Sequence, residues 1–306
     1  MPASTRRSRL SWYRWELPTW GVAAAVYGGF LLVTWNFQTL PLWLAAPSAA
    51  LLLAWHGSLQ HETIHGHPTR LKCVNTAIGA MPLALWLPYS LYRESHLRHH
   101  AEASTLTLPG RDPESHYLTA GARSSIGLVG HAAMQLNCTL AGRLMLGPAI
   151  TMLRLWAGEF RRPVDGRHAG VWLRHVIGVV VVLGWVVGVC GISLPLYLGT
   201  IVYPSVSLAL LRSFAEHRAA PDPGHRTAIV EAHPLWALLF LNNQLHFVHH
   251  EKPHLPWYDM QRAWREMKSS AEIGPGLLFA GGYREIARKY LFRPFIVVEH
   301  PGWEAE

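Results

Sequence analysis

Two long stretches of this chain contain no lysine or arginine. They run from Trp15 to Thr69 and from His175 to Leu211, which is 55 and 37 consecutive residues. A helix rises about 1.5 Å per residue, so roughly 20 apolar residues cross a hydrocarbon layer about 30 Å thick. Each stretch is too long for one crossing and suits two. The sequence therefore predicts a membrane protein.

We predict an all-α integral membrane fold with four transmembrane helices in two hairpins. The expected spans cover about residues 18–37, 42–60, 171–192 and 195–214. Short turns at 38–41 and 193–194 would join the helices of each hairpin. Residues 61–170 and 215–306 would lie outside the membrane as a helical cap, and residues 1–306 would form a single domain.

The 27 lysines and arginines would all lie on one side of the membrane or at its boundary. Because cytoplasmic loops carry the Lys/Arg excess, we expect both termini and the cap on the cytoplasmic side of an inner membrane. Topology and anionic lipid account for the net charge of +8, so nucleic-acid binding is not expected. Three separated cysteines without a CxxC pair predict neither a disulfide framework nor a zinc knuckle.

Two further segments could touch the membrane without crossing it. Residues 74–91 are apolar but contain Pro82 and Pro88, which suits a re-entrant or interfacial segment. Residues 131–156 place Arg143 and Arg154 among leucines, which is typical of an interfacial helix. Each could equally be a buried core helix, and the sequence leaves both interpretations open.

Eight of the 19 histidines fall into three tight groups. On a helix, positions i, i+3 and i+4 share a face, so each group can direct two or three imidazoles to one point. All three groups lie in the predicted cap or at its border. The eight are His61, His65, His96, His99, His100, His246, His249 and His250.

So many imidazoles at ligand spacing indicate metal binding. Unmetallated rings packed together would repel one another once two became protonated. Eight ligands exceed what one four- to six-coordinate metal uses, which favours a two-metal centre. One group is also an H-E-x-x-H pattern, because Glu62 follows His61. A zinc peptidase is thus an alternative, although it leaves both H-x-x-H-H groups unexplained. A metal carrier would need polar residues within the spans, which are nearly absent.

The three groups, H-E-T-I-H, H-L-R-H-H and H-F-V-H-H, resemble the histidine boxes of the membrane fatty acid desaturase and hydroxylase superfamily. The order of the boxes and their relation to two hairpins also match, over about residues 18–260. Members of that family often carry a further histidine after the fourth span, and His217 fits that place. Some members have an Asn one turn before it, where this chain has Ser213.

The resemblance implies two iron ions, cycling between Fe2+ and Fe3+, that use O2 to oxidise C–H bonds of a fatty acyl or lipid chain. A fatty acid desaturase is the expected activity; a hydroxylase, a hydrocarbon oxygenase or a decarboxylase giving a terminal alkene are the alternatives. The small size suggests a bacterial enzyme. We expect the ligands to be the eight box histidines and His217, with outer-shell support from Glu62, Glu94, Asp112, Glu216, Asn242 and Asn243.

Two acidic residues after the second box are ambiguous. Asp112 and Glu114 could orient ligand imidazoles or bind a basic partner, although Asp-Pro also favours a turn. His67 lies off the helical face of His65 and is not expected to bind metal.

Electrons must come from a separate ferredoxin-, rubredoxin- or cytochrome-type donor. His300 begins a His-Pro-Gly sequence typical of a haem domain, but too few residues surround it. A basic region could dock the donor or simply face lipid or solvent. It comprises Arg262, Arg265, Lys268, Arg284, Arg288 and Lys289.

Overall fold

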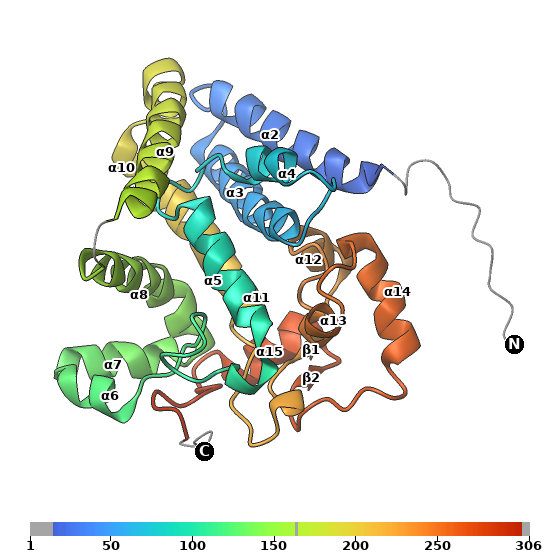
Figure 1. Ribbon diagram of the computed structural model, residues 1–306. Helices are drawn as coiled ribbons and strands as arrows, with labels where there is room; N and C mark the ends of the chain where they lie inside the picture. Colours follow the sequence, from blue (N-terminus) through green and yellow to red (C-terminus); the bar gives the residue numbers. More distant parts are fainter. Residues whose placement is uncertain (1–14, 163–164, 302–306) are drawn as a thin grey trace, which may run out of the picture.

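Four long apolar helices form the upper half of the molecule in the computed structural model, which describes residues 15–162 and 165–301 (Figure 1). They are α2 (Leu17–Trp35), α3 (Leu42–Ile64), α9 (Gly166–Leu183) continued by the π-helical η2 (Gly184–Val189), and α10 (Leu194–Tyr197), η3 (Leu198–Val202) and α11 (Tyr203–Ser213) in one run. Each is long and apolar enough to cross a membrane. The predicted all-α fold with four spans is confirmed, with ends shifted by a few residues.

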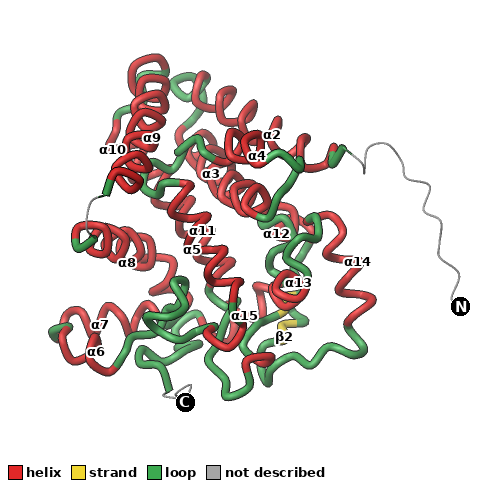
Figure 2. Tube along the Cα trace, viewed as in Figure 1, coloured by secondary structure: helices red, strands yellow, loops and turns green. Residues whose placement is uncertain are grey.

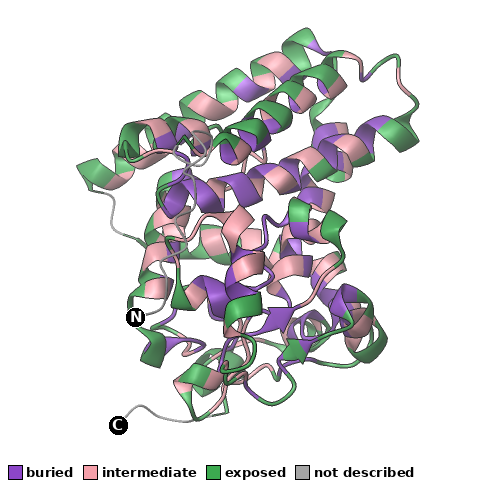
Figure 3. Cartoon of the chain, turned by 90° about the vertical axis from the view of Figure 1, so that its right-hand side faces the viewer, coloured by how far each residue is buried: buried purple, intermediate pink, exposed green. Residues whose placement is uncertain are grey.

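The apolar helices pack through one side and leave the other open. Their shared core includes Phe30, Leu53, Val186, Tyr197 and Ile201. Many residues on the outward faces are exposed, as the green segments of Figure 3 show. Leu32, Trp43, Leu173 and Val180 are among those exposed. Such a surface suits lipid, because an aqueous surface rarely exposes so large an apolar area.

The two hairpins contact each other at their turns. The Trp185 indole donates to Thr34 Oγ1 at 2.9 Å, and the Gln38 amide donates to the Gly191 carbonyl at 3.0 Å. These bonds join the α2–α3 turn to the α9–α10 turn. The opposite ends of the four helices lead into the rest of the chain.

Shorter helices and loops form the lower half of the molecule, where most of the long loops lie (Figure 2). One parallel pair of two-residue strands joins β1 (Ile229–Val230) to β2 (Leu278–Phe279). The shorter helices, of which α4 lies beside α2 and α3 in Figure 1, are α4 (Lys72–Gly79), α5 (Tyr89–Ala101), η1 (Ala103–Thr105), α6 (Ala120–Ser125), α7 (Leu128–Asn137), α8 (Leu140–Phe160), η4 (Pro223–His225), α12 (Pro234–Leu239), α13 (His246–Glu251), α14 (Trp257–Met267) and α15 (Gly282–Tyr290).

Neither of the two ambiguous segments, residues 74–91 and 131–156, forms a single continuous helix. Residues 74–91 begin in α4, become irregular over 80–88 and enter α5. Residues 131–156 divide at Thr139, whose hydroxyl caps the start of α8 by accepting the Gly142 N–H at 3.1 Å. Outward side chains of α7 and α8, such as Leu128 and Leu153, are exposed and apolar.

Candidate metal centre

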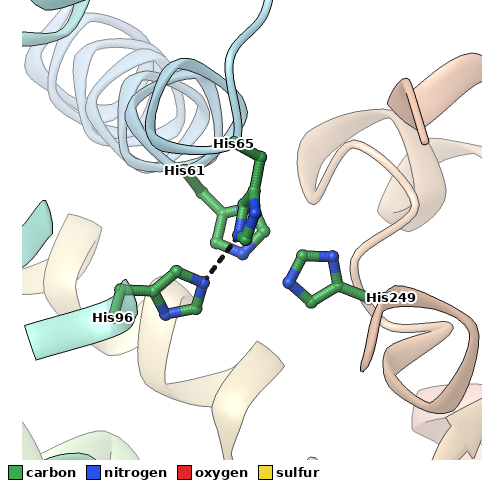
Figure 4. A group of neighbouring side chains, drawn as sticks. All are labelled: His61, His65, His96 and His249. Atoms are coloured by element: carbon green, nitrogen blue, oxygen red, sulfur yellow. Dashed lines mark hydrogen bonds between the residues drawn. The ribbon is translucent and has the colours of Figure 1, made fainter. Parts of the chain in front are cut away.

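Four histidines from three helices form the first group. His61 and His65 lie at the end of α3, His96 on α5 and His249 on α13, and all four are buried. Figure 4 shows their rings directed towards a common space from these elements. One nitrogen from each ring lies within 4.8 Å of the others. The His65 and His96 Nε2 atoms are 3.0 Å apart.

A second group of four histidines lies beside the first. His99 comes from α5, His217 from the loop after α11, and His246 and His250 from α13. Their ligand atoms also lie within 4.8 Å of one another. The Nε2 atom of His217 is 3.0 Å from that of His99 and 2.9 Å from that of His246.

The ninth predicted residue, His100, lies between the two groups. Its Nε2 atom is 3.2 Å from that of His96 and 2.9 Å from that of His249, both in the first group. Its ring stacks on His250 of the second group, with centroids 4.3 Å apart. The fold thus brings all nine sequence-predicted histidines together, and His67, which pairs with Glu16 at 2.9 Å, lies outside.

Acceptors on the outer side of the rings fix which nitrogen faces inward. His96 Nδ1 donates to Glu114 at 2.9 Å and His99 Nδ1 to Asp112 at 2.8 Å. His217 Nδ1 donates to the Arg226 carbonyl at 3.2 Å. A proton on Nδ1 leaves Nε2 of a neutral ring as a lone pair, and this arrangement is typical of metal-binding histidines.

Inward lone pairs at such short range fit bound cations. If both rings are neutral with Nδ1 protonated, the Nε2 atoms of His99 and His217 carry no hydrogen between them, yet they lie 3.0 Å apart. Two imidazole nitrogens on one metal, at about 2.1 Å each and at right angles, would be about 3.0 Å apart. The buried Nε2 of His61 also lacks a hydrogen-bond partner among the described residues. The site fits two metal ions.

Burial keeps most of these rings neutral. Burial and neighbouring histidines lower the pKa of His217 to about 3 and of His100 to about 2. They also lower the pKa of His249 and His250 well below the usual range. Neutral imidazole is the form that binds metal.

The two acidic residues that follow the second box are both outer partners of the rings. Burial raises the pKa of Glu114, but the neighbouring His96 and His99 outweigh it and bring the pKa well below its ordinary value. Glu216 Oε1 lies 3.5 Å from His246 Nδ1 and 3.2 Å from Arg212, and Asn243 donates to it at 3.5 Å. Asp112, Glu216 and Asn243 therefore lie where outer-shell support is predicted, and Glu114, whose role the sequence left open, contacts His96.

Three other predicted outer residues contact different parts of the chain. Glu62 accepts the Trp257 N–H at 3.2 Å, and Asn242 donates to the Trp257 carbonyl at 2.9 Å. Glu62 therefore holds the start of α14 against α3, and Asn242 holds it against the turn between α12 and α13. Glu94 is exposed and lies 3.8 Å from Arg162, turned away from the rings. Helical geometry explains this, because Glu94 precedes His96 by two positions, nearly opposite on α5.

A cavity of about 560 Å³ reaches from the apolar helices to the second histidine group. Its deep part is apolar and includes Leu53, Leu83 and Val206, whereas Glu216 and His217 line it near the rings. Ser213, at the place where some relatives have Asn, also lines it. The volume lies within the range of small-molecule sites, about 300–1,000 Å³.

Four helices able to cross a membrane, with two clusters of four histidines and a bridging ninth at one end, define a membrane protein of the histidine-box type. The chain belongs to the fatty acid desaturase family, whose model, described as fatty acid desaturase, matches residues 37–277. Membership makes it a membrane oxidase of desaturase or hydroxylase type. A comparison with curated protein sequences found no match.

Proposed function

We propose that this protein is an O2-dependent di-iron enzyme that desaturates fatty acyl chains. One observation carries the proposal, namely that nine inward-facing imidazoles converge at the end of a largely apolar cavity. The nine histidines would hold two irons, which when bound supply the activation of O2 that an unactivated C–H bond requires. Desaturation removes two hydrogen atoms from the chain. With two electrons and two protons from outside, these reduce O2 to two waters.

The protein's own residues would position the imidazole rings and the substrate and would exclude water from the cavity. Asp112, Glu114 and the Arg226 carbonyl hold three rings in fixed orientation through Nδ1. The walls of the cavity, with Leu53, Leu83 and other apolar side chains of α3, α11 and the 80–88 loop, would align an alkyl chain beside His217. Such alignment lowers the entropic cost of bringing one C–H bond to the reacting centre.

We also propose a location and an electron-transfer partner for the protein. We propose a single domain in an inner membrane of a bacterial cell, with the histidines on the cytoplasmic side. A separate ferredoxin-, rubredoxin- or cytochrome-type protein would supply electrons. In the basic region on α14 and α15, Arg262, Lys268 and Lys289 pair with Asp259, Glu231 and Glu285. Arg265, Arg284 and Arg288 make no ion pair within the described chain, which leaves them for an acidic donor.

The zinc peptidase alternative finds less support. A peptidase needs the H-E-x-x-H glutamate beside an open position on its metal. Glu62 is buried and accepts the Trp257 N–H, so its carboxylate is occupied in holding α14. His96 and His249 add two further rings to the group of His61 and His65.

Metal analysis and product analysis together test the proposal. We expect about two irons per purified chain and new double bonds in the acyl lipids of a host that expresses it. The variant His246→Ala should lose both, while His233→Ala, altered at an exposed helix N-terminus, should lose neither. New hydroxyl groups would indicate a hydroxylase instead. Unchanged lipids from an iron-loaded protein supplied with reductant, or one zinc per chain, would contradict the proposal.

A further inference from the structure

A second cavity lies beside the main one, next to the helix that carries the second histidine box. It has a volume of about 450 Å³ and lies between α5 and α8. The two cavities share five lining residues and are therefore adjacent; these are Leu91, Ser95, Pro113, Arg154 and Leu155. We call the smaller cavity the arginine mouth, because four arginines line it. They are Arg98, Arg154, Arg161 and Arg162.

Only one of these four charges has a carboxylate partner among the described residues. Arg162 lies 3.8 Å from Glu94 and 3.5 Å from Glu159. Glu159 also pairs with His168 at 2.8 Å, so both mouth carboxylates already have cationic neighbours. Arg98, Arg154 and Arg161 make no ion pair in residues 15–162 and 165–301. Three unpaired guanidinium groups remain at the opening of a largely apolar cavity.

The mouth lies at the same end of the cavity as the histidines. On α5, Leu91, Ser95 and Arg98 follow one stripe that lines the cavities, and His96, His99 and His100 follow another. Arg98 therefore lies within one helical turn of three candidate ligands. Cavity-lining residues of α3 and α11 run from apolar positions such as Leu53 and Val206 towards His61 and His217.

The charge of the mouth reaches the cavity wall. His116 lines the main cavity together with Glu114 and Arg154. Burial, with the cations Arg143 and Arg154, lowers the pKa of His116 well below its ordinary value. In the mouth itself four arginines outnumber the two carboxylates, Glu94 and Glu159, and this excess of positive charge favours an anionic ligand.

We propose that the arginine mouth binds the carboxylate of an unesterified fatty acid whose chain occupies the main cavity. This rests on the proposed function, and it adds that the substrate binds as a free acid and not as an ester. Guanidinium groups suit this role because their planar donors match a carboxylate in pairs. The apolar depth of the cavity receives the tail.

The position of the bound carboxylate decides which carbons of the substrate lie beside the candidate metal centre. Because Arg98 and the candidate ligands share one turn of α5, a bound carboxylate lies at the level of the histidine groups. The carbons closest to the carboxylate then pass His217, and the terminal methyl group lies deep among the apolar helices. Oxidation is therefore expected near the head of the chain rather than at its middle.

Binding of palmitate and methyl palmitate to the iron-loaded protein in lipid nanodiscs tests the head-group site. We expect wild type to bind the acid at least about tenfold more tightly than the ester, since only the acid can form a charge-assisted pair with a guanidinium group. Arg154→Gln should remove this preference while keeping the ester affinity, and Arg154→Lys should keep part of it. Arg293→Gln alters an exposed arginine outside both cavities and serves as the matched control.

The binding measurements do not depend on turnover, so their failure can be distinguished from failure of the desaturation test. Equal affinity of wild type for acid and ester would overturn the head-group site, as would an undiminished preference in Arg154→Gln. Preferential binding of phosphatidic acid over palmitate would overturn the assignment of a free acid. Deuterium placed next to the carboxylate should be lost on turnover, and loss only from mid-chain positions would overturn the predicted placement.

Discussion

Asp112 holds His99 with a carboxylate that is itself fully engaged. Its Oδ1 atom accepts His99 Nδ1 and the Glu114 N–H, each at 2.8 Å, and Oδ2 accepts the Thr107 N–H at 2.8 Å. Thr107 has a φ of 71°, so the carboxylate stabilises a turn that is uncommon for a threonine. One buried side chain thus fixes both a loop and a ring.

Asp112→Asn should weaken metal binding while keeping the side chain's size. An amide has one acceptor atom instead of two, so either His99 or Thr107 loses its partner. Loss of such an outer partner typically costs about 10–100-fold in metal affinity. Iron titration of the apoprotein measures this. Asp165→Asn, altered at an exposed helix cap that asparagine also serves, should leave affinity unchanged; an equal loss there would point to general unfolding.

At the scale of elements, the α7–α8 corner depends on one glycine. A Cβ atom on Gly142 would lie 1.9 Å from the Leu136 carbonyl oxygen, which is backbone and cannot move aside. Gly142→Ala should therefore destabilise the protein by about 1–3 kcal/mol, as overpacking does. Thermal unfolding of the detergent-solubilised protein measures the change.

Gly158→Ala on the same helix is the control. Nothing lies within 4 Å of the Cβ position at Gly158. Removing a glycine from an open helical position should stabilise by about 0.5–1 kcal/mol. Equal unfolding midpoints for the two variants would show that the α7–α8 corner tolerates a side chain.

The elements also show where the sequence was informative. Charge-free stretches predicted the four spans, because a hydrocarbon layer requires long apolar helices. The apolar pattern did not predict that residues 131–156 divide at Thr139. Threonine is a favoured N-cap residue, so Thr139 itself was the available signal. The spacing of the boxes predicted which histidines converge, but the division into two groups depends on how α5 and α13 cross, which no local pattern encodes.

For the whole molecule, the histidine end and the hairpin turns should lie on opposite sides of the membrane. Cys73 is exposed on α4, close to the histidine end of α3, and Ser193 is exposed at the α9–α10 turn. A membrane-impermeant thiol reagent should label Ser193→Cys on intact cells, in a Cys190→Ser background. Cys73 should react only after permeabilisation. Labelling of Cys73 on intact cells would reverse the orientation expected from the lysines and arginines.

The features that the sequence did not predict depend on contacts between distant parts of the chain. The arginine mouth joins Arg98 on α5 to Arg154 and Arg161 on α8, about sixty residues apart, so the sequence showed only separate basic residues. Glu94 was expected beside a ligand because it is close in sequence, yet it faces Arg162 across the mouth. Proximity along a helix does not place two side chains on the same face.

Each histidine group combines residues from both halves of the chain. The first requires His61 and His249, and the second requires His99 and His250, so neither is complete before α13 has been synthesised. While only the first hairpin has left the ribosome, its imidazoles have no partners from α13. With the two irons of the proposed function, complete loading would follow insertion of both hairpins, and iron uptake would report completed membrane assembly in a growing cell.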